Sequence, residues 1–169
     1  MMLLMSLVMI SACDKDDDGD LDVDLLTEQE FVTRAAASNL FEITSSEMAM
    51  NNASTDTVMS FAAQMIADHT QASNELKAIA DRKNLTVPTT LPQEKQQTVD
   101  SLSTQMGIPF DKDYMDAQVR AHIESVTLFE VASEDLDDAE LRQFAAKTLP
   151  ILRMHLEMAE GIEDMTDDL

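Results

Sequence analysis

Residues 56–79 of the chain read DTVMSFAAQMIADHTQASNELKAI, and this stretch decides the fold. Its apolar residues recur at alternating intervals of four and three, which places them along one side of an α-helix. The stripe consists of Val58, Ala62, Met65, His69, Ala72, Leu76 and Ile79. The pattern predicts a long helix over about 56–84 that buries this face, with a histidine in the middle of it.

The same spacing recurs in three further segments. They cover about 28–52, 111–135 and 137–162. Residues 85–110 contain three of the four prolines and a short helical pattern near 93–106. Asp111 or Asp113 is the expected cap of the helix that follows. Two hairpins of long helices joined by such a crossover predict an all-α fold, namely a ferritin-like four-helix bundle with a long crossover containing a short helix.

The first long helix has two candidate buried stripes. One consists of Phe31, Ala35, Ser38, Glu42, Ser45 and Ala49, and the other of Val32, Ala36, Asn39, Ile43, Ser46 and Met50. Spacing alone leaves both open. The first stripe places Glu42 inside the bundle, between two serines that are small enough to leave it room.

Composition agrees with a helical fold and excludes one class of partner. The 169 residues include only 3 Gly and 4 Pro, which disfavours turn-rich β folds. Acidic residues number 33 against 11 basic ones, for a net charge of -22. Because the phosphate backbone would be repelled by this charge, we expect no binding to nucleic acid.

The start of the chain predicts a bacterial lipoprotein. Residues 1–12 are apolar and uncharged, too short to span a bilayer, and typical of a signal peptide. They end in Ile-Ser-Ala before Cys13, which is the lipobox pattern, so Cys13 is the predicted lipidation site. The following stretch, 13–26, is rich in Asp and predicts a disordered acidic tether. Lysine and clustered acids after the cysteine favour an envelope protein anchored in the outer membrane and exposed at the cell surface.

The three histidines, His69, His122 and His155, fall on three different helices, each on the apolar stripe. With Glu42 they form a plausible ligand set for one divalent transition metal, namely Zn, Fe, Mn or Cu. A di-iron centre is excluded because no histidine has a Glu three residues before it. The alternative is that the histidines are hydrogen-bonded core residues that hold the helices in register.

Position along the bundle axis distinguishes one candidate ligand from the other three. Counted from the turn between the first two long helices, Glu42, His69 and His122 lie at similar depths, whereas His155 lies about 15 Å from His69 at 1.5 Å per residue. Axial position is therefore compatible with a site of Glu42, His69 and His122, and His155 is the doubtful member.

Four segments of the chain resemble a known family. They are Asp68–Leu76, Phe110–Met115 followed by His122, Leu149–Leu156, and Phe41–Ile43. They resemble the uncharacterised "predicted outer membrane protein" family, domain of unknown function 4142, over about residues 28–162. The resemblance implies a ferritin-like bundle exported to the bacterial envelope and a shared role for the three histidines, but no activity. Asp68 and Tyr114 lie in these segments and are candidates for residues that orient the ligands. Thr44 stands where the family often has a second Glu, which argues against a carboxylate-rich site.

We therefore expect a signal peptide at 1–12, a tether at 13–26, the bundle at 27–162 and a frayed acidic tail at 163–169. The expected function is a lipid-anchored envelope protein that binds a ligand or has a structural role without turnover, and we do not expect an enzyme. The rival is a metal-binding or redox protein that uses His69, His122 and Glu42.

Overall fold

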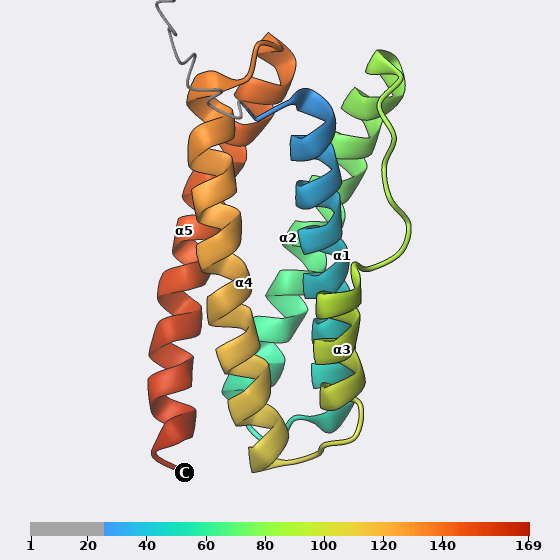
Figure 1. The fold of residues 1–169 in the computed structure, drawn as a ribbon. Helices are drawn as coiled ribbons and strands as arrows, with labels where there is room; N and C mark the ends of the chain where they lie inside the picture. Colours follow the sequence, from blue (N-terminus) through green and yellow to red (C-terminus); the bar gives the residue numbers. More distant parts are fainter. Residues whose placement is uncertain (1–25) are drawn as a thin grey trace, which may run out of the picture.

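The computed structural model describes residues 26–169 and contains five α-helices (Figure 1). They are α1 (Glu28–Asn52), α2 (Asp56–Lys83), α3 (Gln93–Leu102), α4 (Ile108–Asp135) and α5 (Ala139–Asp167). No strand occurs in this part of the chain, which confirms the all-α prediction. The expected signal peptide, Cys13 and nearly all of the expected tether lie outside the described residues.

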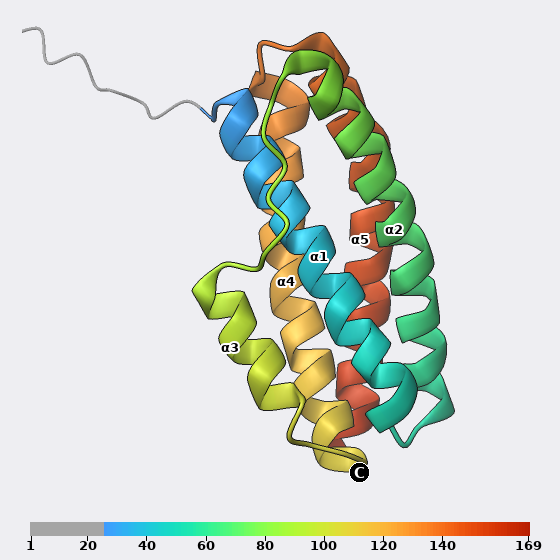
Figure 2. The same ribbon diagram turned by 90° about the vertical axis from the view of Figure 1, so that its right-hand side faces the viewer.

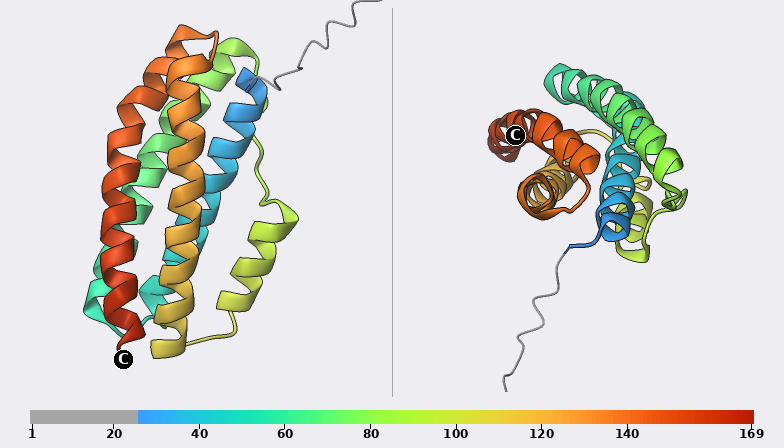
Figure 3. Two further views of the ribbon diagram at one scale, coloured as in Figure 1. Left: turned by 60° about the vertical axis from the view of Figure 1, so that its left-hand side comes forward. Right: turned by 90° about the horizontal axis from the view of Figure 1, so that it is seen from above.

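The four long helices form two antiparallel hairpins, α1–α2 and α4–α5, which pack with α1 against α4 and α2 against α5 (Figures 1 and 2). The segment after α2 runs back along the whole bundle, so that α2 and α4 point the same way. It carries α3, which stands on the outside of the four long helices (Figure 3). The predicted four-helix bundle with a helix in its crossover is therefore confirmed.

The helix α3 covers the seam between α1 and α4. Its Val99 packs with Phe41 of α1 and with Ala117 and Ala121 of α4. The short helix ends earlier than the sequence suggests, at Leu102, and Met106 beyond it is 71% exposed.

The start of α4 differs from the prediction. The helix begins at Ile108, with Pro109 in its first turn, and neither Asp111 nor Asp113 caps it. The buried Asp111 carboxylate instead accepts hydrogen bonds from Ser54 N (3.0 Å), Ser54 Oγ (2.9 Å) and Thr55 N (3.0 Å). It therefore ties the α1–α2 turn to α4 and fixes the relative height of the two hairpins.

The end of α5 also differs. The sequence predicts fraying after Ile162, but the helix continues to Asp167. Thr166 is buried, and Lys112 Nζ of α4 donates a hydrogen bond to the Asp167 carbonyl at 3.1 Å. Contacts with α4 thus stabilise a last turn that is too acidic to be expected from sequence alone.

The α1 stripe that contains Glu42 is buried as predicted, and the rival stripe is buried in part. All six residues of the stripe that contains Glu42 are buried. Val32, Ala36, Asn39 and Ser46 of the rival stripe are buried as well, whereas Ile43 is half-buried and Met50 is exposed. The buried face is wide because α1 packs against α2, α3 and α4.

Two apolar clusters fill the bundle at different heights. The first contains Phe31, Phe129 and Phe144, with ring centroids 5.1–6.3 Å apart. The second contains Phe61 and Tyr114. Along α2, α4 and α5, the histidine lies between residues of one cluster and residues of the other, so that the histidines form a polar layer between two apolar ones.

Candidate metal centre

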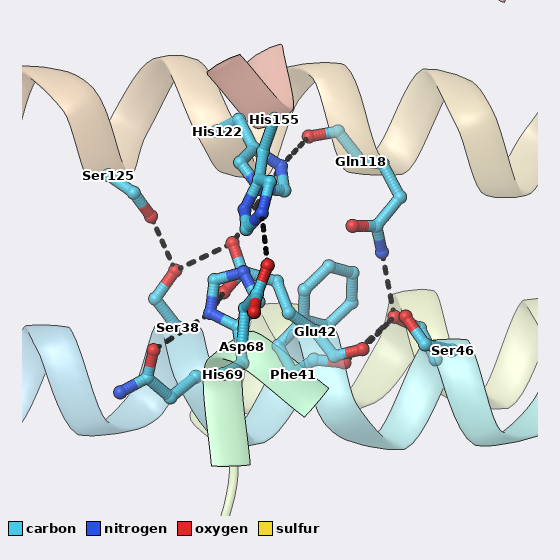
Figure 4. Close-up of polar contacts among 12 residues, drawn as sticks. Ser38, Phe41, Glu42, Ser46, Asp68, His69, Gln118, His122, Ser125 and His155 are labelled. Atoms are coloured by element: carbon cyan, nitrogen blue, oxygen red, sulfur yellow. Dashed lines mark hydrogen bonds and ion pairs between the residues drawn. The ribbon is translucent and has the colours of Figure 1, made fainter. Parts of the chain in front are cut away.

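The three histidines meet in the polar layer between the apolar clusters. His69, His122 and His155 are 2%, 0% and 0% exposed. Their ring centroids lie 5.4–5.6 Å apart, and one ring nitrogen of each lies within 4.8 Å of the others. The imidazoles of three helices thus share one small volume (Figure 4).

The inclusion of His155 overturns the axial estimate made from the sequence. His69 and His122 lie 13 and 14 residues from the starts of α2 and α4, and His155 lies 12 residues before the end of α5. All three of these helix ends are at the same end of the bundle (Figure 1). About half of the error comes from ending α5 near Ile162, five residues before its observed end at Asp167, which placed His155 about 7.5 Å too close to that end.

Each histidine has one ring nitrogen held by a neighbour. His122 Nδ1 lies 2.9 Å from the Gln118 carbonyl, one turn earlier on α4. His155 Nε2 lies 2.9 Å from Asp68 Oδ2 of α2. His69 Nδ1 lies 2.9 Å from Asn39 Oδ1 of α1. A carbonyl or carboxylate oxygen can only accept, so these contacts assign the proton of each ring to the bonded nitrogen.

The other nitrogen of each ring is unpaired. His69 Nε2, His122 Nε2 and His155 Nδ1 are buried and have no hydrogen-bond partner among the described residues. The alternative in which the histidines are hydrogen-bonded core residues is met at one nitrogen of each ring by a partner among the described residues. One ring nitrogen of each histidine lies within 4.8 Å of the others, which is close to the spacing that one metal ion requires, and oxygen partners that hold the rings are typical of metal-binding histidines.

The spacing suits one ion after a small adjustment. Bonds of about 2.0–2.1 Å keep two nitrogens on one metal no more than roughly 4 Å apart. Because the ligand atoms lie within 4.8 Å of one another, each ring would have to move by less than an ångström. Buried His69, His122 and His155 can therefore bind a metal.

Glu42 lies behind the ligands and is not one of the converging groups. Its Oε2 is 2.8 Å from His69 Nδ1 and its Oε1 is 3.9 Å from His122 Nδ1, so it faces the ring nitrogens that the Asn39 side chain and the Gln118 carbonyl also hold. Ser38 Oγ donates to Glu42 Oε1 at 3.4 Å. The sequence places Glu42 among the ligands and leaves His155 doubtful, whereas in the structure the group whose nitrogens lie within 4.8 Å of one another is His69, His122 and His155, with Glu42 beside two of them.

Burial and the Glu42 carboxylate set the protonation states of the histidines in this layer. Burial alone raises the pKa of Glu42, but His69 and His122 beside it bring the pKa down to about 2. Burial opposes protonation of His69, yet the Glu42 carboxylate raises the pKa of His69 above its ordinary value. Burial lowers the pKa of His122 and lowers that of His155 to about 4. At pH 7 His122 and His155 are therefore neutral, and Glu42 is charged.

The two candidate orienting residues have different positions. Asp68 contacts His155 directly. Tyr114 lies one layer away, where its hydroxyl is 2.8 Å from Ser46 Oγ and its ring stacks on Phe110 at 5.7 Å. Tyr114 therefore contacts none of the three imidazoles by a hydrogen bond among the described residues.

Two residues at the site were missed from the sequence. Asn39 and Gln118 hold His69 and His122, but the Gln118 contact uses the backbone carbonyl, which every residue has. Asn39 carried a signal, since a buried amide on an apolar stripe needs a partner, but the choice between the two stripes of α1 concealed it.

Fold and site together define a helical-bundle protein with a buried histidine cluster able to bind a metal. The chain belongs to the family described as Domain of unknown function (DUF4142), which it matches over residues 18–162. None of the helices in residues 26–169 is both long and apolar enough to cross a membrane.

Two solved structures share the fold. One is a crystal structure of a DUF305 fragment from Deinococcus radiodurans, with a TM-score of 0.72 and 14% identity, covering 81% of this chain and 95% of that chain. The other is CopM in the Cu(II)-bound form, with a TM-score of 0.70 and 16% identity, covering 83% of this chain and 97% of that chain. No curated protein matches the chain. At these identities the likeness concerns the fold.

Proposed function

We propose that this protein binds one divalent transition-metal ion in the cell envelope, through His69, His122 and His155, and does so without catalytic turnover. The observation that carries the proposal is the convergence of three buried imidazoles, each of which also has one nitrogen without a partner among the described residues. Glu42, Asn39, Asp68 and the Gln118 carbonyl would then orient the ligands. An ion at the centre would satisfy three nitrogens that otherwise remain buried without partners.

The ligand chemistry restricts the ion. Neutral imidazoles suit copper, zinc, iron and nickel, whereas calcium and magnesium prefer oxygen. The buried charge of Glu42 offsets part of the charge of a divalent ion in this dry interior. CopM, which shares the fold, is described in a Cu(II)-bound form, so copper is the first ion to test and zinc the second.

Metal analysis of the full chain, purified without a histidine tag, tests the proposal. After incubation with Cu(II) or Zn(II) and gel filtration, we expect one ion per chain and a melting temperature that falls when EDTA removes it. If neither ion is retained and EDTA leaves the melting temperature unchanged, the proposal is wrong.

Variants then assign the ligands. His122→Gln keeps a side chain that can bond to the Gln118 carbonyl but removes an imidazole, so we expect loss of the stoichiometric ion from a folded protein. Tyr114→Phe is the matched control, since it removes one buried hydroxyl from the same helix and should leave the metal content unchanged. An unchanged metal content in His122→Gln would contradict the assignment.

We further propose that the bundle is tethered to the outer membrane through a lipid on Cys13, and that it is displayed at the cell surface. The lipobox and the acidic stretch after it support this, and both lie outside the described residues. Two acyl signals suffice for stable anchoring. Cys13→Ala should therefore shift the protein from the membrane fraction to the soluble one, and persistent membrane association of this variant would refute the anchor.

A further inference from the structure

A small cavity lies between α2 and α5, beside the histidine layer. It measures about 60 Å³, the space of about two water molecules. His69 and His155 form part of its wall. Asp68, Glu75 and Lys147 also line it, and their side chains are 37%, 36% and 58% exposed. The cavity therefore lies between solvent and two of the three candidate ligands.

The other sides of the histidine layer are more closely covered. The α1–α4 seam lies beneath α3 (Figure 2). Two cavities of about 240 and 150 Å³ adjoin α3, but neither is lined by any of the three histidines. Above and below, the two apolar clusters fill the interior between the helices. The cavity between α2 and α5, lined by two histidines and by Asp68, thus offers a hydrated cation a polar path toward the histidine layer.

Asp68 spans the boundary between this path and the interior. Its side chain is 37% exposed, whereas that of His155, 2.9 Å away, is 1% exposed. Gln64 Nε2 also lies 3.5 Å from the same carboxylate oxygen, Oδ2. A carboxylate in this position can contact a cation in the cavity while it still holds the ring that the cation must reach.

We propose that the α2–α5 cavity is the portal through which the metal reaches the centre, and that Asp68 is its first ligand on the way in. This inference rests on the proposed function. Asp68 receives the partly hydrated ion at the mouth, His155 and His69 bind it next, and His122, which does not line the cavity, binds last. On release the order is reversed, so the ion dissociates from His122 first and from Asp68 last.

This route predicts a kinetic signature. A narrower portal hinders the ion equally in both directions, because the bound and free end states are unchanged. Association and dissociation should therefore slow by the same factor, and Kd should stay constant. Loss of a ligand or of the fold would instead change Kd.

The test follows Cu(II) binding and release by stopped-flow on the full chain. Cu(II) is delivered as its glycine complex, and release is followed with excess EDTA. Ala72→Phe places a ring in the cavity, and Ile151→Trp adds bulk at an exposed position on its wall. Thr98→Phe is the matched control, since Thr98 lines the larger cavity beside α3.

We expect at least tenfold slower association and release in Ala72→Phe or Ile151→Trp, with an unchanged Kd and an unchanged Cu(II) spectrum, and wild-type rates in Thr98→Phe. Asp68→Asn retains an acceptor for His155 but removes the charge, so its association should slow about three- to tenfold. A residue that only positions His155 would change release and leave association unaltered.

Two outcomes overturn the inference and are distinguishable from failure of the proposed function. If folded Ala72→Phe and Ile151→Trp both bind one Cu(II) at wild-type rates, the α2–α5 cavity is not the portal, although the proposed metal centre is still supported. If Asp68→Asn associates at the wild-type rate, Asp68 is not the first ligand. A wild-type protein that binds no Cu(II) or Zn(II) would instead remove the metal centre itself.

Discussion

Acid should destabilise the metal-free protein through His155, and the size of the effect follows from its burial. The ring is fully buried, and burial lowers its pKa to about 4, whereas the unfolded chain has an ordinary histidine pKa near 6.5. Stability from keeping this ring neutral is therefore fully present above about pH 6.5 and is lost as the pH falls toward 4. With these two pKa values, linkage gives a loss of about 2 kcal/mol between pH 7 and pH 5.

The assay is urea unfolding of the EDTA-treated protein at several pH values, followed by circular dichroism because the chain has no tryptophan. His155→Gln is the matched control, since it keeps an amide beside Asp68 but does not titrate. The other groups that titrate in this range, including His122, His69 and the many carboxylates, are common to both proteins and cancel to first order.

We expect the wild type to lose about 2 kcal/mol more than His155→Gln between pH 7 and pH 5. Plotted against pH, the free energies of unfolding of the two proteins should run parallel above pH 7 and diverge below it. Parallel curves throughout would show that His155 titrates normally in the folded state, and the reasoning from burial would then be wrong.

Three further predictions concern the scaffold. Phe31→Ala, which empties the space between two neighbouring aromatic rings, should lower the free energy of unfolding by about 3–5 kcal/mol in urea titrations, without changing the metal content. Asp111→Ala removes the buried acceptor for the α1–α2 turn and should cost about 3 kcal/mol by the same measurement, with Asp111→Asn less affected. Arg153→Gln breaks an exposed ion pair with Glu130, and its melting temperature should match that of the wild type, since such pairs contribute about 0.5 kcal/mol or less.

The sequence determined which side chains point inward, because helical periodicity fixes the direction of each residue around its own helix. That is why His69, His122 and His155 could be assigned to the interior, whereas Glu42 lay on one of two stripes that spacing left open, and why the bundle and its crossover followed from spacing and prolines alone. The family resemblance added a shared role for the three histidines but no geometry.

Only the tertiary structure decided which inward residues meet. The height of one helix against another depends on where each helix ends, and the last turn of α5 exists because α4 supports it through Lys112 and the burial of Thr166. Because of that turn the end of α5 lies further from His155 than the sequence suggested, and the packing of α5 against α4 and α2 sets His155 level with the other imidazoles, while the side-by-side packing of α1 and α2 places Glu42 beside His69. A periodic pattern contains the angle of a residue about its helix axis and not its position along a neighbouring helix, so the ligand set could be read only from the packed bundle.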